Sequence, residues 1–106
     1  MSTHVSTIIL QQLGGNRFLA MTGAKDLLAM DTAGKVGLRM RLPANLTKGR
    51  ATHLEVVLTE RDDYTLALFK SATLRRERQD LDVREGVYVD NLRAVFTDMT
   101  GLDTHL

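Results

Sequence analysis

The chain has 106 residues and a mass of 11.8 kDa, which is the size of one small domain. Hydrophobic residues make up 43% of it and charged residues 25%, a balance that excludes a charged disordered tail, a collagen and a chain rich in Pro and Gly. It contains no cysteine, which excludes disulfides, thiolate metal sites and cysteine nucleophiles. The composition therefore predicts one globular domain over residues 1–106.

The formal net charge is only +1, but the charges are unevenly distributed along the chain. Residues 1–54 contain seven basic residues and two acids, whereas residues 55–106 contain seven basic residues and eleven acids. No acid occurs between Thr32 and Leu54. This asymmetry is typical of a surface with one positive side. The alternative is a mixed surface on which the charges interleave after folding.

No stretch of the sequence approaches the roughly 18 apolar residues that a membrane-spanning helix needs. The apolar run at residues 8–10 is too short for a secretory signal, and no basic segment precedes it. We therefore expect a cytoplasmic protein that does not contact a membrane.

The first third of the chain predicts short elements. Residues 2–13 place their apolar side chains on one stripe of a helix, and the two glycines that follow favour its end. Residues 17–22 are apolar without a clear period, and we expect them to be extended. Residues 23–30 fit either a helical turn or a strand, and residues 31–34 are typical of a turn.

Three later stretches, residues 35–42, 52–59 and 64–70, alternate between apolar and polar side chains, which is typical of strands with one buried face. Pro43 ends the first of them because proline has no amide hydrogen to donate. A compact turn joins the second to the third, so the three predict an antiparallel meander. Its apolar face is expected to carry Val36, Leu38, Met40, Leu54, Val56, Leu58, Leu66 and Leu68.

The last third begins with a charged segment, residues 71–85, which fits a longer third strand, a fourth strand or a loop. From Gly86 onward the spacing predicts a helix, with Asp82 and Glu85 near its start and Gly101 at its end. The helix stripe consists of Tyr88, Leu92, Val95, Phe96 and Met99. The predicted fold class is α+β, an antiparallel sheet of three to four strands packed by an N-terminal and a C-terminal helix.

Signatures of catalysis are absent from the sequence. The three histidines, His4, His53 and His105, lie far apart without the spacing of metal ligands, and no GxSxG motif occurs. The glycines of residues 14–26 have the wrong spacing for a phosphate-binding loop. We therefore expect no enzymatic activity, no metal site and no cofactor.

The candidate binding residues are basic. The alternation in residues 35–42 places three of them on one face of a strand, where they can meet the phosphates of a nucleic acid. Others follow in the next loop and after the third strand, and the full set is Lys35, Arg39, Arg41, Lys48, Arg50, Arg75, Arg76 and Arg78. Because guanidinium groups bind phosphates and carboxylates alike, DNA, RNA and an acidic protein surface all remain open as partners.

A purely structural role is also open for these side chains, because Arg39 and Arg41 can pair across strands with Glu55 and other acids. Aromatic residues that could stack on bases are few. Only Phe69 is expected on the polar face of the sheet, opposite Leu66 and Leu68.

Three segments carry a resemblance: QQLGGNRFLAMTGAK at residues 11–25, LRMRLP at 38–43 and GVYVDNLRAVFTDMTGL at 86–102. Together they resemble a family of small, largely uncharacterised proteins of tailed bacteriophages, prophages and related mobile elements. The resemblance spans nearly the whole chain, although residues 74–84 depart from the family pattern. It implies the cytoplasm of a bacterial host and an accessory role, such as binding DNA or RNA or inhibiting host defence.

Our leading hypothesis is a non-enzymatic module that contacts nucleic acid through the basic strand face and the loop that follows it. The alternative is a protein that inhibits a host factor such as a defence nuclease. In that case phosphates would be mimicked by Asp80, Asp82, Asp90 and Asp98. An exposed outer strand also allows a homodimer.

Overall fold

The computed structural model describes residues 4–32 and 34–104. The start of the predicted first helix, Ala33 in the predicted turn, and His105 therefore lie outside the described residues. The elements in chain order are α1 His4–Leu13, α2 Gly15–Thr22, β1 Lys25–Thr32, β2 Lys35–Arg41, the 3-10 turn η1 Lys48–Arg50, β3 His53–Leu58, β4 Tyr64–Lys70, β5 Gln79–Val87 and α3 Val89–Thr100. The predicted α+β class is confirmed.

The strands form one antiparallel sheet in the order β1-β2-β3-β4-β5, so each strand pairs with its neighbours in sequence. The predicted meander corresponds to β2, β3 and β4, with ends that differ by at most one residue. The expectation of three to four strands was too low, because β1 and β5 extend the meander at both edges. Residues 23–30, which fitted a helical turn or a strand, contribute most of β1.

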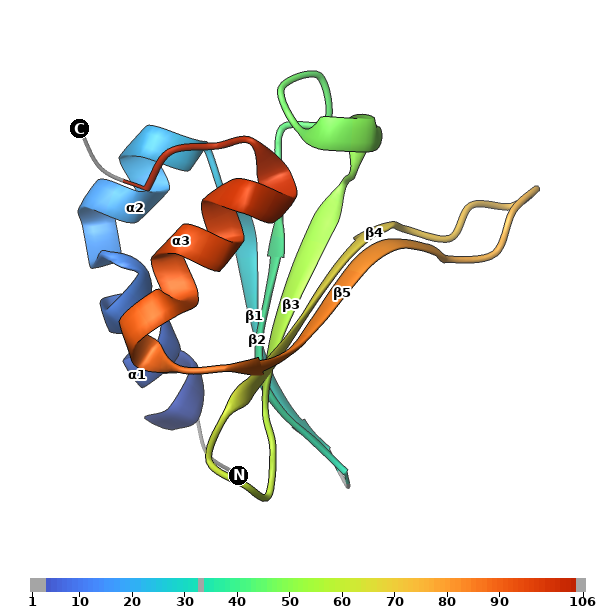
Figure 1. Cartoon of the computed structure of the whole chain (residues 1–106). Helices are drawn as coiled ribbons and strands as arrows, with labels where there is room; N and C mark the ends of the chain where they lie inside the picture. Colours follow the sequence, from blue (N-terminus) through green and yellow to red (C-terminus); the bar gives the residue numbers. More distant parts are fainter. Residues whose placement is uncertain (1–3, 33, 105–106) are drawn as a thin grey trace.

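All three helices lie on one face of the sheet, and the other face is left open (Figure 1). The apolar face predicted from alternation is the covered one, although Val36 and Leu58 at its margin are only half-buried. The helices contribute Ile9, Leu13, Phe18, Leu92, Phe96 and Met99 to the core, and the sheet contributes Leu38, Met40, Leu54, Val56, Leu66 and Leu68.

The expectation that residues 17–22 are extended was wrong, because they form helix α2. Gly14 has φ 129°, a conformation that favours glycine, and it redirects the chain between α1 and α2. One side chain, Phe18, anchors this helix by packing edge-to-face on Phe96 with the ring centroids 5.0 Å apart. Because α2 has only eight residues and buries a single aromatic ring, its sequence shows no clear helical repeat of apolar residues.

The boundary between β5 and α3 also differs from the prediction. Strand β5 continues through Gly86, and Tyr88, expected in the core, is the N-terminal cap of α3 with 55% of its surface exposed. Its amide donates a hydrogen bond of 2.8 Å to Oδ1 of Asn91. Asp82 and Glu85 belong to β5, so the acid in the first turn of the helix is Asp90.

The open face of the sheet is defined by the outward side chains of β2, β3 and β4. Near its centre, β2 and β3 approach each other closely at Gly37, which is paired with Val57. A Cβ atom on Gly37 would lie 1.9 Å from the carbonyl oxygen of Val56, which no rotamer change can relieve because the obstacle is backbone. The outward side chains are Lys35, Arg39, Arg41, His53, Glu55, Val57, Thr65, Ala67 and Phe69.

We predict that Gly37→Ala destabilises the fold by about 2 kcal/mol, because β2 and β3 must separate locally to admit the methyl group. Urea unfolding followed by circular dichroism measures this loss. Gly34→Ala is a partial control: no atom lies within 4 Å of its added Cβ, although its positive φ adds backbone strain. A Gly37→Ala protein as stable as the wild type would contradict the close approach.

Candidate nucleic-acid interface

The two ends of the sheet carry opposite charge. One end is formed by residues 25–26, 39–53 and 69–80, which contain nine basic residues and three acids. We call it the positive end; its cations are Lys25, Arg39, Arg41, Lys48, Arg50, Lys70, Arg75, Arg76 and Arg78. The other end, formed by residues 31–32, 34–35, 57–65 and 85–90, contains two basic residues and six acids. The folded chain is therefore an electric dipole along the strand direction.

Seven of the eight predicted binding residues gather at the positive end. Lys35 does not, because it begins β2 at the opposite end of the sheet. Two further cations, Lys25 and Lys70, were not among the predicted residues. The sheet register brings them to this end beside Arg41 and Gln79, respectively. Lys70 is the last residue of the predicted strand 64–70 and directly precedes the basic segment, so its place at this end could have been predicted. Lys25 could not have been placed, because residues 23–30 fitted either a helical turn or a strand.

Arg39 and Arg41 both project from the open face, as the alternation predicted. Arg41 lies 3.7 Å from a carboxylate oxygen of Asp26, in a pair whose two side chains are more than half exposed. Arg39 lies opposite Glu55 in the register, yet it forms no ion pair among the described residues. The predicted pairing with Glu55 is therefore absent for Arg39, and an exposed pair such as Arg41–Asp26 is weak enough for Arg41 to exchange its partner.

The carboxylate of Glu55 is instead taken by two other cations. Glu55 is only 3% exposed, and its Oε1 lies 3.0 Å from Nη2 of Arg78 and 3.4 Å from Nζ of Lys35. Arg78 also donates from Nε to Asp80 at 2.9 Å. These contacts join the segment after β4 to the middle of the open face, so Arg78 has a structural role that the sequence did not reveal.

Phe69 points to the open face as predicted, but it is fully buried. The guanidinium of Arg78 lies 3.7 Å from the centre of its ring and that of Arg39 lies 5.1 Å away. The imidazole of His53 stacks beside it at 5.4 Å. The ring thus supports a layer of cations and is not itself available for stacking on a base.

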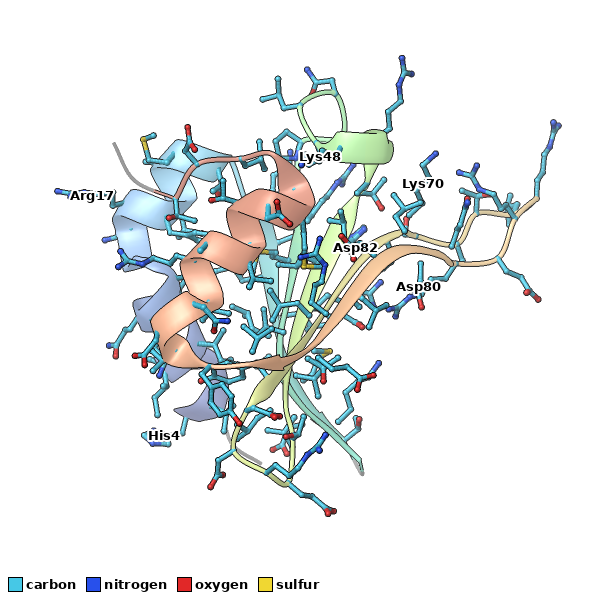
Figure 2. All side chains as sticks on the ribbon, viewed as in Figure 1. His4, Arg17, Lys48, Lys70, Asp80 and Asp82 are labelled. Carbon is cyan, nitrogen blue, oxygen red and sulfur yellow. The ribbon has the colours of Figure 1, made fainter. Side chains whose placement is uncertain are left out.

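The loop of residues 43–52 carries two predicted residues with different roles. Lys48 donates a hydrogen bond of 2.8 Å from Nζ to the carbonyl of Asp98, and this ties the loop to the C-terminal end of α3 (Figure 2). Arg50 is exposed and has φ 58°, a left-handed conformation that costs an arginine about 1 kcal/mol. Lys48 therefore positions the loop, and Arg50 is the cation the loop presents to solvent.

Residues 71–78 form a hairpin arm that extends beyond the body of the sheet (Figure 1). The arm is closed by a bridge between Thr73 and Arg76, with amide-to-carbonyl distances of 2.8 and 3.3 Å. Figure 2 shows Lys70 and Asp80 on opposite sides of the ribbon at the base of the arm. The tip presents cations to solvent, because residues 72–80 are all exposed.

The pKa of His53 is lowered from 6.5, first by burial and then by the neighbouring charges of Arg39 and Arg41. Asp26 and Glu55 oppose this shift. The hydroxyl of Thr52 lies 2.8 Å from its Nδ1, close enough to stabilise the neutral imidazole. The pKa of His53 is therefore lowered mainly by burial and secondly by its two arginine neighbours.

We predict that His53 makes the fold less stable in mild acid. Because its pKa is lower in the folded chain, the unfolded chain takes up a proton first as the pH falls below 6.5, and the free energy of unfolding decreases. Urea unfolding at about pH 7.5 and about pH 5.5 should show a smaller decrease for His53→Gln than for the wild type. An unchanged decrease in His53→Gln would contradict this, and His4→Gln, exposed on α1, serves as the control.

The four acids proposed to mimic phosphates do not form one row. Asp80 pairs with Arg78 on the open face, whereas Asp82 lies opposite Leu68 on the helix side of the sheet. Asp82 and Asp98 both bind Arg84, at 2.9 Å from Nε and Nη2, respectively. Within residues 4–32 and 34–104, no group of three or more metal-ligating side chains comes together.

Comparison of the chain with protein-family models, with curated proteins and with solved structures finds no match. Of the helices in the described part of the chain, none is both long and apolar enough to cross a bilayer. A function for the chain is therefore inferred from the geometry of the positive end.

Proposed function

We propose that this protein is a non-enzymatic module that binds nucleic acid through the positive end of its sheet. The observation that carries the proposal is the separation of charge, with nine basic residues against three acids at this end and two against six at the other. A dipole of this kind orients the chain toward a polyanion and speeds their encounter.

The state of the individual cations supports the proposal. Seven of the nine have no ion pair among the described residues: Lys25, Arg39, Lys48, Arg50, Lys70, Arg75 and Arg76. Arg50, Arg75 and Arg76 stand on two projections, the loop of residues 43–52 and the arm. The guanidinium groups of Arg39 and Arg78 lie over the ring of Phe69 on the open face. These cations can therefore contact several phosphates of one nucleic-acid backbone at the same time.

The alternative, an inhibitor that mimics nucleic acid with its acids, has less support. Asp80, Asp82 and Asp98 are each already bound by an arginine of this chain. The resemblance to proteins of tailed phages sets the proposed binding in an infected bacterial cell, where DNA and RNA are both present.

The proposal is tested by fluorescence anisotropy with labelled duplex DNA, single-stranded DNA and RNA at about 50 mM salt. We expect binding by the wild type and about tenfold weaker binding by Arg39→Ala/Arg41→Ala, since two phosphate contacts are lost. The matched control is Arg61→Ala/Arg93→Ala, which removes two exposed arginines away from the positive end. Circular dichroism establishes that each variant is folded.

A wild-type protein that binds none of the three nucleic acids at this salt concentration would overturn the proposal. Equal weakening of both double variants would contradict the assigned surface. A second readout is the pKa of His53, measured by NMR, which should rise when a bound polyanion neutralises Arg39 and Arg41.

A further inference from the structure

The tip of the arm combines an exposed apolar side chain with two arginines. Leu74 is fully exposed, with a relative exposure of 107%, and it is followed directly by Arg75 and Arg76. Leu74 and Arg75 are the two residues of the turn that the Thr73–Arg76 bridge closes. A leucine in this position contributes nothing to the core, so its apolar surface is available to a partner.

The arm is held in a defined direction. At its tip, the amide of Arg75 donates to Oγ1 of Thr73 at 3.3 Å, which tightens the turn. At its base, Arg78 binds Glu55 and Asp80 and lies on the ring of Phe69. The tip is therefore presented by a ribbon that is fastened to the sheet.

The aromatic residues favour a duplex over a single strand. Proteins that bind single strands stack the bases on exposed aromatic rings. Here Phe18, Phe69, Phe96 and Tyr64 are buried, and Tyr88 is exposed at the end of the sheet opposite the arm. The positive end can meet phosphates, but it has no aromatic platform for unpaired bases.

We infer that the nucleic acid is duplex DNA and that the arm enters one of its grooves with Leu74 as an apolar wedge. This inference rests on the proposed function. A two-stranded ribbon fits a groove of B-form DNA, and apolar side chains inserted between base steps kink the helix. Arg75 and Arg76 would contact the phosphates that line the groove. Duplex RNA is a poor fit, because its major groove is too narrow and its minor groove too shallow.

The inference is tested with a duplex of about 30 base pairs that carries a fluorescence donor and acceptor at its ends and 2-aminopurine at a central TA step. We expect the wild type to raise energy transfer, by bending, and 2-aminopurine emission, by unstacking. Leu74→Ala should bind within about threefold of the wild type and lose most of both signals. The matched control is Val89→Ala, which removes an apolar side chain that is 51% exposed at the start of α3, at the other end of the sheet, and should behave as the wild type.

Three results would overturn the inference while leaving the proposed function in place: duplex binding without bending or unstacking, full bending by Leu74→Ala, or tighter binding to single-stranded DNA or duplex RNA than to duplex DNA. Failure to bind any nucleic acid would overturn both. Because Leu74 makes no core contact, its substitution leaves the fold intact, and a matching unfolding curve verifies this.

Discussion

Arg78→Ala is expected to lower the free energy of unfolding by about 3 kcal/mol. The substitution leaves the buried carboxylate of Glu55 with only Lys35 as a partner, at 3.4 Å, and uncovers the ring of Phe69. Removing the partner of a buried carboxylate costs much more than removing an exposed charge, because the carboxylate that remains stays desolvated. Urea unfolding of the variant measures the loss.

A double-mutant cycle separates this charge effect from lost packing. In the Glu55→Gln background no carboxylate is left to be stranded, so Arg78→Ala should then cost about 1 kcal/mol. The control is Arg76→Ala in the exposed arm, which should change the free energy of unfolding by less than about 0.5 kcal/mol. Equal costs of Arg78→Ala in both backgrounds would contradict the role assigned to Glu55.

Reversing the charges that face solvent at the positive end should have the largest effect on binding. We expect Arg50→Glu/Arg75→Glu/Arg76→Glu to weaken binding to duplex DNA at least about 1000-fold, since three phosphate contacts become repulsive. None of the three side chains forms an ion pair within the described residues, so the fold should be retained. Fluorescence anisotropy measures the affinity.

The matched control for this variant is Arg17→Glu/Arg61→Glu/Arg93→Glu. These three arginines are also exposed, and their reversal changes the net charge by the same amount, but they lie outside the segments of the positive end. We expect the control to weaken binding less than about tenfold, through the change in net charge alone. Similar losses in the two triple variants would show that net charge, and not the positive end, determines binding.

The central part of the fold could be predicted because the inward positions of β2, β3 and β4 are all apolar at every second residue, even though Val57, Ala67 and Phe69 are apolar on the outward face. β5 was only one of three alternatives for its segment, because the charged Asp82 and Arg84 share its inward side with Leu81 and Val87. Asp82 is paired there with Arg84. α2 escaped prediction because a single ring, Phe18, fixes it. α2 thus depends on a tertiary contact with Phe96, and β5 depends on an ion pair between charged neighbours, and neither leaves the apolar periodicity on which a prediction from sequence depends.

The part of the candidate site that lies on a single strand, β2, could be predicted from the sequence. The alternation of apolar and polar residues in β2 correctly placed Arg39 and Arg41 on the open face. The burial of Glu55 and the role of Arg78 depend on the register between strands and on the path of the arm, which no local pattern encodes. The same holds for Lys48, whose partner, the carbonyl of Asp98, lies fifty residues away in the chain.

The most direct test of the account is the salt dependence of wild-type binding to duplex DNA. If about five phosphates are contacted at the positive end, the logarithm of the association constant should fall with the logarithm of salt concentration with a slope of about −4.5. A slope near zero, or no binding at about 50 mM salt, would contradict a function based on the positive end.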